Sequence, residues 1–322
     1  MQVFTYIEHK NGVVDDSALE LITAAQAIDS GCLPTAIVLG SPSEAAAIAQ
    51  TMAQSYAQVI MVGHAALSYP NAEICRKVLC QLLPAKALLL VPHSTFGMDL
   101  GPGLSIKLDG AFASDVVGFE GMDQGKLKVV RQEYGGAVST RSLCDLSDGA
   151  VINIRAGSFK AEEATTQAGA VVDKIAEIKD YSSKRTFIKV IEAEVGEVDI
   201  TKSETLISIG RGIGEEENLE MVHKLAKTMG ADVACSRPIV DVKWLEKCRQ
   251  VGTSGQTVKP KVYLALGISG SFQHMGGIKG NPFIIAVNKN PTAPIFQRAD
   301  VGVVADILEF IPALTEKVAL AK

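Results

Sequence analysis

Short apolar segments alternate with segments of helical periodicity along the first third of the chain. The pattern predicts strands at residues 2–8, 35–39, 58–62 and 87–91. It predicts helices at 17–28 and 72–83, and Ser41-Pro-Ser-Glu44 has the form of a capping box with proline at the first helical position. This alternation is typical of parallel strands joined by crossover helices.

The pattern changes after about residue 113. Strands are predicted at 115–119, 127–134, 150–155 and 187–194, with fewer helices between them, and we expect them to extend the same sheet. Residues 199–205 are mostly polar and lack periodicity, so we place a domain boundary at their start. The predicted domains are an N-terminal α/β domain at 1–197 and a second domain at 198–322.

The second half restarts the alternation. Strands are predicted at 206–210, 232–235, 262–266, 283–287 and 301–304, with a turn at 211–215 and a closing helix at 312–320. A helix at 216–229 has acidic residues in its first turn and is stopped by Gly230. We therefore expect two α/β domains: a mostly parallel, nucleotide-binding-like sheet, then a doubly wound flavodoxin-like or Rossmann-like domain.

Composition narrows the class of protein. The 322 residues are 47% hydrophobic and carry a net charge of −5 without a dense Lys/Arg run, which argues against general nucleic-acid binding. The six cysteines include no C-x-x-C, so we expect thiols in a reducing compartment and no metal site. No signal segment or membrane span is recognisable, and we expect a soluble cytoplasmic protein.

Polar side chains follow two of the predicted strands in the second half. Ser269, Gln273 and His274 come after the strand at 262–266, and Asn288 ends the strand at 283–287. Ligands of open α/β sheets bind beyond the carboxyl ends of strands, so this set suits a flat, hydrogen-bonding cofactor. A lone His274 would be read as a core or capping histidine; its polar neighbours favour a site.

Three further turns have weaker signals. Gly210-Arg211-Gly212-Ile-Gly214 suits an anion at a helix start but lacks the full G-x-G-x-x-G spacing, and a plain turn fits equally well. Ser236-Arg237-Pro238 favours an extended Arg237 aimed into a cleft, or else an ordinary ion pair. The loop 250–255 fits a phosphate, a heterocycle or a linker. His93–Asp99 and Gly157–Phe159 fit structural or interface roles, since no nucleophile elbow is present.

These residues resemble the α subunit of electron-transfer flavoprotein. The resemblance is carried by L-A-L-G-I-S-G-S-F-Q-H-M-G-G at 264–277, A-V-N-K-N-P-T-A-P-I-F-Q-R-A-D at 286–300 and V-A-D at 304–306. The first half is similar more loosely, through T-F-G-M-D-L-G-P at 95–102 and R-A-G-S-F at 155–159. The resemblance implies a heterodimer with a β subunit, one FAD in this chain's second domain, and AMP or a second FAD mainly in the partner.

The resemblance also assigns residues to the FAD. Arg211 corresponds to a pyrophosphate-side arginine, Arg237 to an arginine against the flavin, Ser254 to a residue near flavin N5, and His274 to one near the O2 carbonyl. Asn288 and Asp306 correspond to residues on the ribose–adenine side. The full implied set is Gly210, Arg211, Gly212, Ser236, Arg237, Gln250, Val251, Gly252, Thr253, Ser254, Gly267, Ile268, Ser269, Gln273, His274, Asn288 and Asp306.

This chain departs from the family pattern at two places. The loop reads V-G-T-S-G where V-G-Q-T-G is commoner, so Thr253 replaces a glutamine and Ser254 a threonine. In the first half, Met98 and Gly103 replace the arginines of G-R-D-L-x-P-R, which leaves partner contacts there open.

The implied function is an electron carrier in β-oxidation-type chemistry, between flavin dehydrogenases such as acyl-CoA dehydrogenases and an acceptor oxidoreductase. Arg237, Ser254 and His274 would tune the redox potential, and no residue would act as a general base. A close alternative is the α subunit of an electron-bifurcating, NADH-dependent version. From other classes, an NAD-dependent dehydrogenase and a nucleotide-binding regulatory module stay open.

Overall fold

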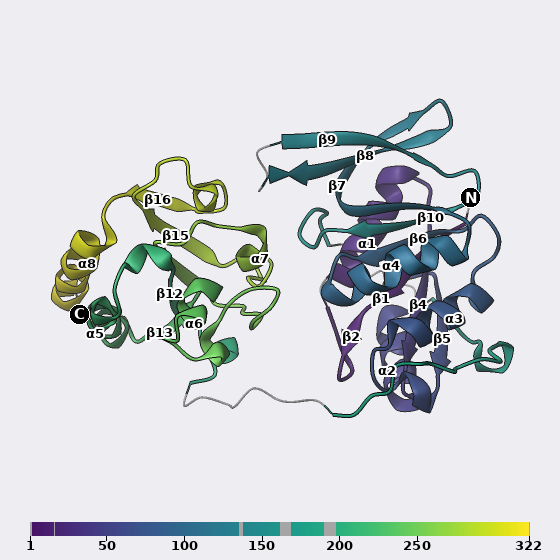
Figure 1. The fold of residues 1–322 in the computed structure, drawn as a ribbon, viewed down its shortest axis with the longest axis horizontal. Helices are drawn as coiled ribbons and strands as arrows, with labels where there is room; N and C mark the ends of the chain where they lie inside the picture. The colour runs from purple at the N-terminus through teal and green to yellow at the C-terminus, as the bar shows by residue number, and fades with distance from the viewer. Residues whose placement is uncertain (1, 16, 135–137, 162–168, 190–197, 322) are drawn as a thin grey trace. The chain divides into compact units, whose positions relative to one another are not determined.

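The computed structural model describes residues 2–15, 17–134, 138–161, 169–189 and 198–321. The chain divides into two compact units, Met1–Lys189 and Val190–Lys322 (Figure 1). The boundary that we expect between residues 197 and 198 adjoins a segment, 190–197, that lies outside the described residues, so its exact position stays a prediction.

A nine-stranded sheet forms the centre of the first unit, as far as the structure describes it. Its order is β11-β5-β4-β1-β6-β10-β7-β8-β9; neighbours from β11 to β7 run parallel, and β7, β8 and β9 form an antiparallel meander. The strands are β1 (Val3–Ile7), β4 (Thr35–Gly40), β5 (Gln58–Gly63), β6 (Leu88–Pro92), β7 (Ala111–Asp123), β8 (Lys126–Glu133), β9 (Val138–Asp145), β10 (Ala150–Ile154) and β11 (Ala170–Asp173), with a small hairpin of β2 (His9–Lys10) and β3 (Val13–Val14).

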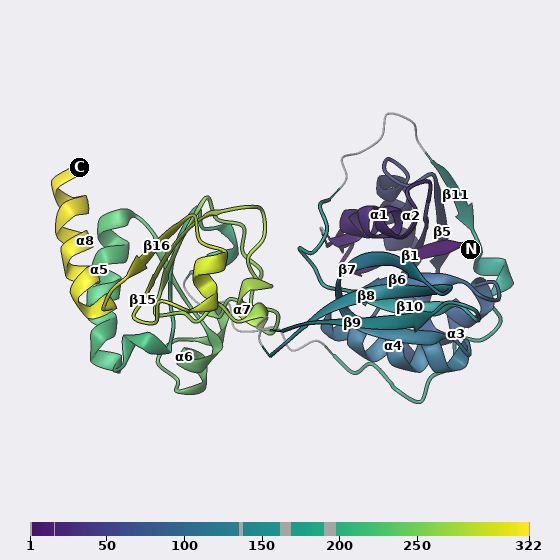
Figure 2. The same ribbon diagram turned by 90° about the horizontal axis from the view of Figure 1, so that it is seen from above.

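Helices cover both faces of this sheet. Figure 2 shows α1 (Ser17–Ile28) and α2 (Pro42–Met52) on one face and α3 (Ala72–Leu82) and α4 (Thr95–Lys107) on the other. Half of the predicted capping box is present: the backbone N–H of Glu44 donates to the Ser41 hydroxyl at 3.4 Å, while the Glu44 carboxylate accepts from that hydroxyl instead of from the Ser41 backbone N–H. The expected α/β architecture with a mostly parallel sheet is thus confirmed.

Helix α4 was not predicted, because Gly97, Gly101 and Pro102 are typical of a loop. In the structure Ser94 caps the helix by accepting the N–H of Gly97 at 2.9 Å. A Cβ at Gly97 would lie 2.0 Å from the carbonyl oxygen of Pro92, and one at Gly101 would lie 2.7 Å from Asn153 Oδ1. The glycines are therefore what allows this helix to lie directly on β6 and β10.

The strand predicted at 187–194 is wrong for its described part, since residues 187–189 are not in a strand. Residues 190–194 lie outside the described residues. Phe187 stacks on Tyr69, with ring centroids 4.2 Å apart, and this packing holds the segment against the bend that precedes α3. Strands β9 and β11, which do belong to the sheet, were not predicted.

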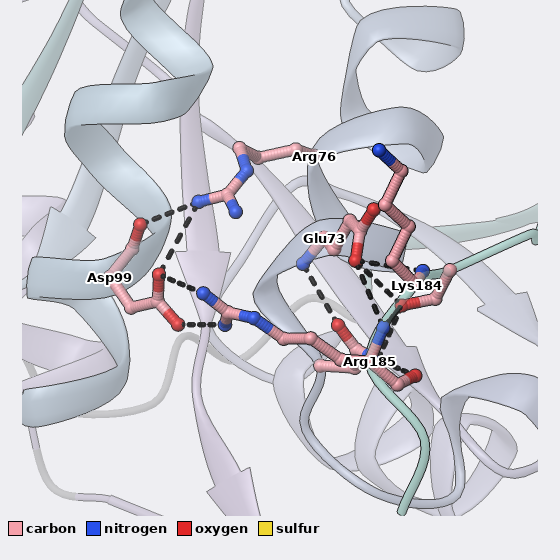
Figure 3. Close-up of polar contacts among 7 residues, drawn as sticks. Glu73, Arg76, Asp99, Lys184 and Arg185 are labelled. Carbon is pink, nitrogen blue, oxygen red and sulfur yellow. Dashed lines mark hydrogen bonds and ion pairs between the residues drawn. The ribbon is translucent and has the colours of Figure 1, made fainter.

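Residues 179–187 form a strap across α3 and α4 (Figure 3). The Glu73 carboxylate accepts hydrogen bonds from the Ser183 hydroxyl at 2.9 Å and from the backbone N–H groups of Lys184 and Arg185 at 3.0 and 3.2 Å. The Arg185 guanidinium binds both oxygens of Asp99, which also contacts Arg76. These bonds lower the pKa of Glu73 and that of Asp99, so both carboxylates stay charged.

The strap lies where the sequence departs from the family pattern. A Cβ at Gly103 would lie 3.0 Å from Arg76 Nη1, so the glycine leaves room for the guanidinium of Arg76. Arg76 Nη1 donates to the backbone oxygen of Asp99 at 2.6 Å. The other replaced position, Met98, is 47% exposed. Arginines from α3 and the strap therefore gather around Asp99.

Truncating Glu73 tests whether its carboxylate holds the strap. In Glu73→Ala, the N–H of Lys184 loses its acceptor, and that of Arg185 keeps its bond to the Ser183 hydroxyl oxygen at 3.0 Å. We therefore expect amide hydrogen exchange to accelerate by roughly tenfold or more at Lys184 and by less at Arg185. Hydrogen–deuterium exchange followed by NMR or mass spectrometry measures this. Glu177→Ala removes an exposed carboxylate that pairs with Lys174 and is the matched control. Unchanged exchange at 184–185 would contradict the clamp.

The second unit is built on a five-stranded, fully parallel sheet in the described residues, with the order β13-β12-β14-β15-β16. Numbered along the chain this order is 2-1-3-4-5, that of flavodoxin-like folds. Helices α5 (Leu219–Met229) and α8 (Ile307–Ala321) lie side by side (Figures 1 and 2). The strands are β12 (Thr205–Ile209), β13 (Asp232–Cys235), β14 (Val262–Leu266), β15 (Phe283–Asn288) and β16 (Val301–Val304).

The predicted doubly wound α/β fold of the second domain is thereby confirmed, but some of its helices differ from the predicted ones. The closing helix begins at Ile307, five residues before its predicted start, and Pro312 lies inside it. Short helices α6 (Arg237–Asp241) and α7 (Phe272–Met275) occupy segments that we took as turns. Single 3₁₀ turns lie at Ala65–Leu67, Ile175–Glu177, Ile200–Lys202, Arg211–Ile213, Glu216–Asn218, Lys247–Arg249 and Pro294–Gln297.

The two faces of the second sheet are covered differently. On one face Val222 and Leu225 of α5 and Ile311 of α8 pack with the strands. On the other face loop residues such as Val251 and Ile295 complete the core. Among the described residues, no helix combines the length and the apolar character needed to cross a bilayer.

Candidate functional site

A cavity of about 650 Å³ lies at the carboxyl ends of the strands in the second unit. The residues that directly follow β12, β13 and β14 line it, namely Gly210, Ser236 and Gly267, together with Asn288 at the end of β15. The chain leaves β12 toward β13 on one side and later returns to β14 on the other, so this edge is the switch point of the sheet. Cofactors of such folds bind at this position, in cavities of this size.

Backbone packed on backbone forms one wall of the cavity. The N–H of Gly210 donates to Leu266 O at 2.9 Å, and the N–H of Gly212 donates to Gly267 O at 3.2 Å. A Cβ at Gly210 would lie 2.4 Å from Gly267 O, and Gly267 has a φ of +65°. Only glycines permit this approach, which brings the two turns together beneath the cavity.

Two arginines flank the cavity. Arg211 lies in the turn after β12 and makes no ion pair within the described part of the chain. Arg237 is the first residue of α6, and its Nε lies 3.5 Å from Asp241 Oδ2, with both side chains mostly exposed. The prediction of an extended Arg237 is wrong: Ser236 is extended, and Pro238 is tolerated in the first helical turn, where its missing N–H has no role.

The loop after α6 contributes an amide and a hydroxyl. Gln250 Nε2 donates to the Ser254 hydroxyl oxygen at 2.9 Å, and both residues line the cavity. Because this oxygen already accepts a hydrogen bond, the hydroxyl proton of Ser254 is available to a ligand. Thr253 does not line the cavity; its backbone N–H donates to Gln273 O at 2.8 Å and so ties this loop to α7.

His274 lies in α7 and is held from behind by a buried tyrosine. Tyr263 of β14 is fully buried, and its hydroxyl lies 2.8 Å from His274 Nε2. Burial lowers the pKa of His274 to about 4, so the imidazole is neutral at pH 7. The histidine therefore brings to the cavity wall a polar ring without a full charge, in an orientation that Tyr263 fixes.

Asn288 and Asp306 were both predicted to lie on the ribose–adenine side of the ligand, but they differ in their position relative to the cavity. Asn288 lines the cavity, and its Nδ2 donates to Ile268 O at 2.9 Å. Asp306 follows β16 at the sheet edge, binds Lys289 at 2.8 Å and accepts the N–H of Leu308 at 2.9 Å at the start of α8. Asp306 does not line the cavity, and its predicted role in binding stays a prediction.

The structure brings fifteen of the seventeen predicted residues to one cavity, the exceptions being Thr253 and Asp306. It also adds residues that the sequence reasoning missed. Asp241 comes from the short helix α6, and Asn290, Ala293 and Pro294 come from the quoted N-K-N-P-T-A-P run, in which we had assigned a role to Asn288 alone. Tyr263 was missed because it lies in a strand that is buried almost throughout, where no alternation of buried and exposed residues marks the position.

The candidate residues of the first unit have structural partners. His93 Nε2 lies 3.7 Å from Asp115, and Asp115 forms a two-point ion pair with Arg155 at 2.6 and 2.7 Å. Ser94 caps α4, and the N–H of Gly157 donates to Glu20 at 2.6 Å. His93, Ser94 and Asp99 thus serve three different contacts, which agrees with the structural reading of this segment.

Tyrosine-to-phenylalanine replacement tests the support behind His274. Tyr263→Phe keeps the ring but leaves His274 Nε2 without its partner, and we expect a loss of about 1–3 kcal/mol in the free energy of unfolding. Urea denaturation at pH 7 measures it. Tyr69→Phe, at a side chain that is 45% exposed, is the control and is expected to change little. Equal stability of Tyr263→Phe and the unmodified chain would show that the bond contributes nothing.

Fold and cavity together define a flavodoxin-like nucleotide-binding domain joined to a second α/β domain. Residues 3–179 match the family model of the electron transfer flavoprotein domain, and residues 199–279 match that of the electron transfer flavoprotein FAD-binding domain. The chain belongs to the electron transfer flavoprotein family, as an α subunit, and functions as a flavin-binding electron-transfer protein.

Curated relatives agree with this assignment over nearly the whole chain. Protein FixB of Clostridium saccharobutylicum is 30% identical over 97% of this chain and 94% of its own length. The electron transfer flavoprotein subunit alpha of Thermoanaerobacterium thermosaccharolyticum is 29% identical over 98% and 97%. Protein FixB of Salmonella typhimurium is 37% identical over 72% of this chain and 73% of its own length. The similarity therefore includes both units.

Proposed function

We propose that this chain pairs with a β subunit and carries electrons through one FAD held in the cavity of the second unit. The electrons come from a flavin dehydrogenase, such as an acyl-CoA dehydrogenase, and pass to an acceptor oxidoreductase. AMP or a second FAD belongs mainly to the partner. The observation that carries the proposal is the polar cavity at the switch point, flanked by Arg211 and Arg237.

The residues present fit an FAD. A dinucleotide needs close backbone approach and positive charge at its pyrophosphate, which the Gly210–Gly212 turn and Arg211 offer. A flavin ring needs hydrogen-bond donors along its polar edge. The residues that offer them are Arg237, Ser254 through its hydroxyl, and His274. The G-R-G-x-G spacing at 210–214, which departs from G-x-G-x-x-G, disfavours an NAD-dependent dehydrogenase.

Bound FAD supplies the redox chemistry, accepting and giving electrons one or two at a time. The chain's own residues position and tune it. Arg237 and the polar groups of the cavity wall favour negative charge beside them, and the Ser254 proton is placed to be donated. A neutral His274 stabilises negative charge by a hydrogen bond alone, so its effect does not depend on protonation near pH 7. No general base is required.

Copurification with the β subunit tests the proposal. We expect a yellow heterodimer containing one FAD and one AMP, with no bleaching by NADH. Two FAD per heterodimer and rapid bleaching by NADH would instead identify the electron-bifurcating version. A colourless heterodimer that takes up no FAD on reconstitution would overturn the proposal and favour a regulatory module that binds an uncoloured nucleotide.

Removing His274 tests its tuning role. We expect His274→Ala to lower the potential of the first one-electron reduction, because a hydrogen bond to a charged group is worth about 1.5–3 kcal/mol, or about 60–130 mV for one electron. Potentiometric titration of the heterodimer gives the value. His223→Ala, on the exposed side of α5 and outside this cavity, is the control. A potential unchanged within 20 mV, roughly a twofold effect, would remove His274 from the tuning set.

A further inference from the structure

A second cavity in the same unit is basic. Its volume is about 550 Å³, and Lys243, Trp244, Lys247 and Arg249 line it together with His223 of α5. Glu246 is its single acidic lining residue. The whole chain has a net charge of −5, so this surface reverses the general sign of the protein. None of the three Lys and Arg side chains makes an ion pair within the described residues.

The lining is partly fixed and partly exposed. Arg249 Nη1 donates to Val233 O at 2.9 Å, which holds that guanidinium beside β13. Lys243 and Lys247 are exposed, and Lys243 has a φ of +63°, in the left-handed region that a lysine seldom adopts. Trp244, the single tryptophan of the chain, is half-buried beside them, and Val242 is 52% exposed.

This basic cavity and the candidate flavin cavity share one wall. Within α6, Arg237, Pro238 and Asp241 face the flavin cavity, whereas Val240 faces the basic one. The two cavities also meet at residues 249 and 250, because Arg249 lines the basic cavity and its neighbour Gln250 lines the flavin cavity. A single chain segment, 237–250, thus separates the basic cavity from the candidate flavin cavity, and this segment itself carries Arg237.

From these observations we infer that the basic cavity is the docking point for an acidic surface of a protein that exchanges electrons with this chain. The inference rests on the proposed function. Lysines at the rim attract a negatively charged protein and speed the encounter, while Trp244 and Arg249 are of the residue types that anchor protein interfaces. A small anion is a poorer fit, since small-ligand sites bury most of their ligand and these lysines are exposed.

Charge reversal at the rim tests the inference on the FAD-containing heterodimer. Flavodoxin serves as an acidic one-electron protein probe, and cytochrome c as a basic one. For Lys243→Glu/Lys247→Glu we expect the second-order rate of electron transfer to flavodoxin to fall about tenfold or more at low salt, and the rate to cytochrome c to rise. Raising the ionic strength to about 0.15 M should narrow the flavodoxin difference, since screening then acts within about 8 Å.

Lys227→Glu/Lys317→Glu is the matched control, because it changes the net charge equally at exposed positions of α5 and α8 outside both cavities. Equal loss in both double variants would overturn the inference and show an effect of net charge alone. An unchanged rate of electron transfer to flavodoxin in Lys243→Glu/Lys247→Glu would also overturn the inference. If calorimetry then showed saturable binding of ATP at this cavity, the site would be one for a small anion.

A binding measurement separates this inference from the proposed function. Calorimetric affinity of the heterodimer for flavodoxin does not require electron transfer, and we expect about a tenfold weakening in Lys243→Glu/Lys247→Glu but not in the control. A heterodimer that lacks FAD yet shows this difference in affinity would refute the proposed electron-carrier function and would still support the docking surface. A heterodimer with normal FAD and no difference would refute the docking surface alone.

Discussion

The close contact between the turn after β12 and the turn after β14 is the constraint on which the site depends. Gly210 and Gly212 lie so near Gly267 that side chains there would overlap backbone atoms. The N–H of Gly267 in turn donates to Val287 O at 2.9 Å, which ties the contact to β15. Because these bonds join three strand ends, the cavity is a property of the rigid sheet, and the loops only add side chains to it.

The side chains that these loops add to the cavity differ in how strongly salt and pH affect them. Arg211 and Arg237 are exposed cations, whereas His274 is buried, neutral and fixed by Tyr263. The cavity thus combines positive charge that salt can screen with a hydrogen-bonding group that salt and pH near neutrality leave unchanged. Such a division suits a site that must hold a phosphate-bearing ligand and also set the electronic properties of its ring.

The sequence predicted what depends on local periodicity and on strand ends. Strands β13, β14 and β16 have their predicted bounds, and the residues after β13 and β14 gather as expected because parallel strands share one carboxyl edge. It failed where tertiary contacts override local preference. Helix α4 contains glycines that are typical of a loop, but here they allow close packing on Asn153. The apolar residue Phe187 favoured a strand at 187–194, but its side chain stacks on Tyr69. Tyr263 was missed because a buried strand residue gives no local sign of its partner.

The interlocked glycine turns have a consequence for how such a protein diverges. Its cradle is made of main chain and tolerates almost no substitution at Gly210, Gly212 and Gly267, whereas the side chains of Ser254 and Asp241 line the cavity without taking part in that main-chain contact. Retention of the ligand and adjustment of its chemistry are therefore encoded at separate positions. Related sequences can therefore differ in the chemistry of the bound molecule while they keep the same main-chain cradle, and an engineer can follow this route by varying the side chains that line the cavity and leaving the glycines unchanged.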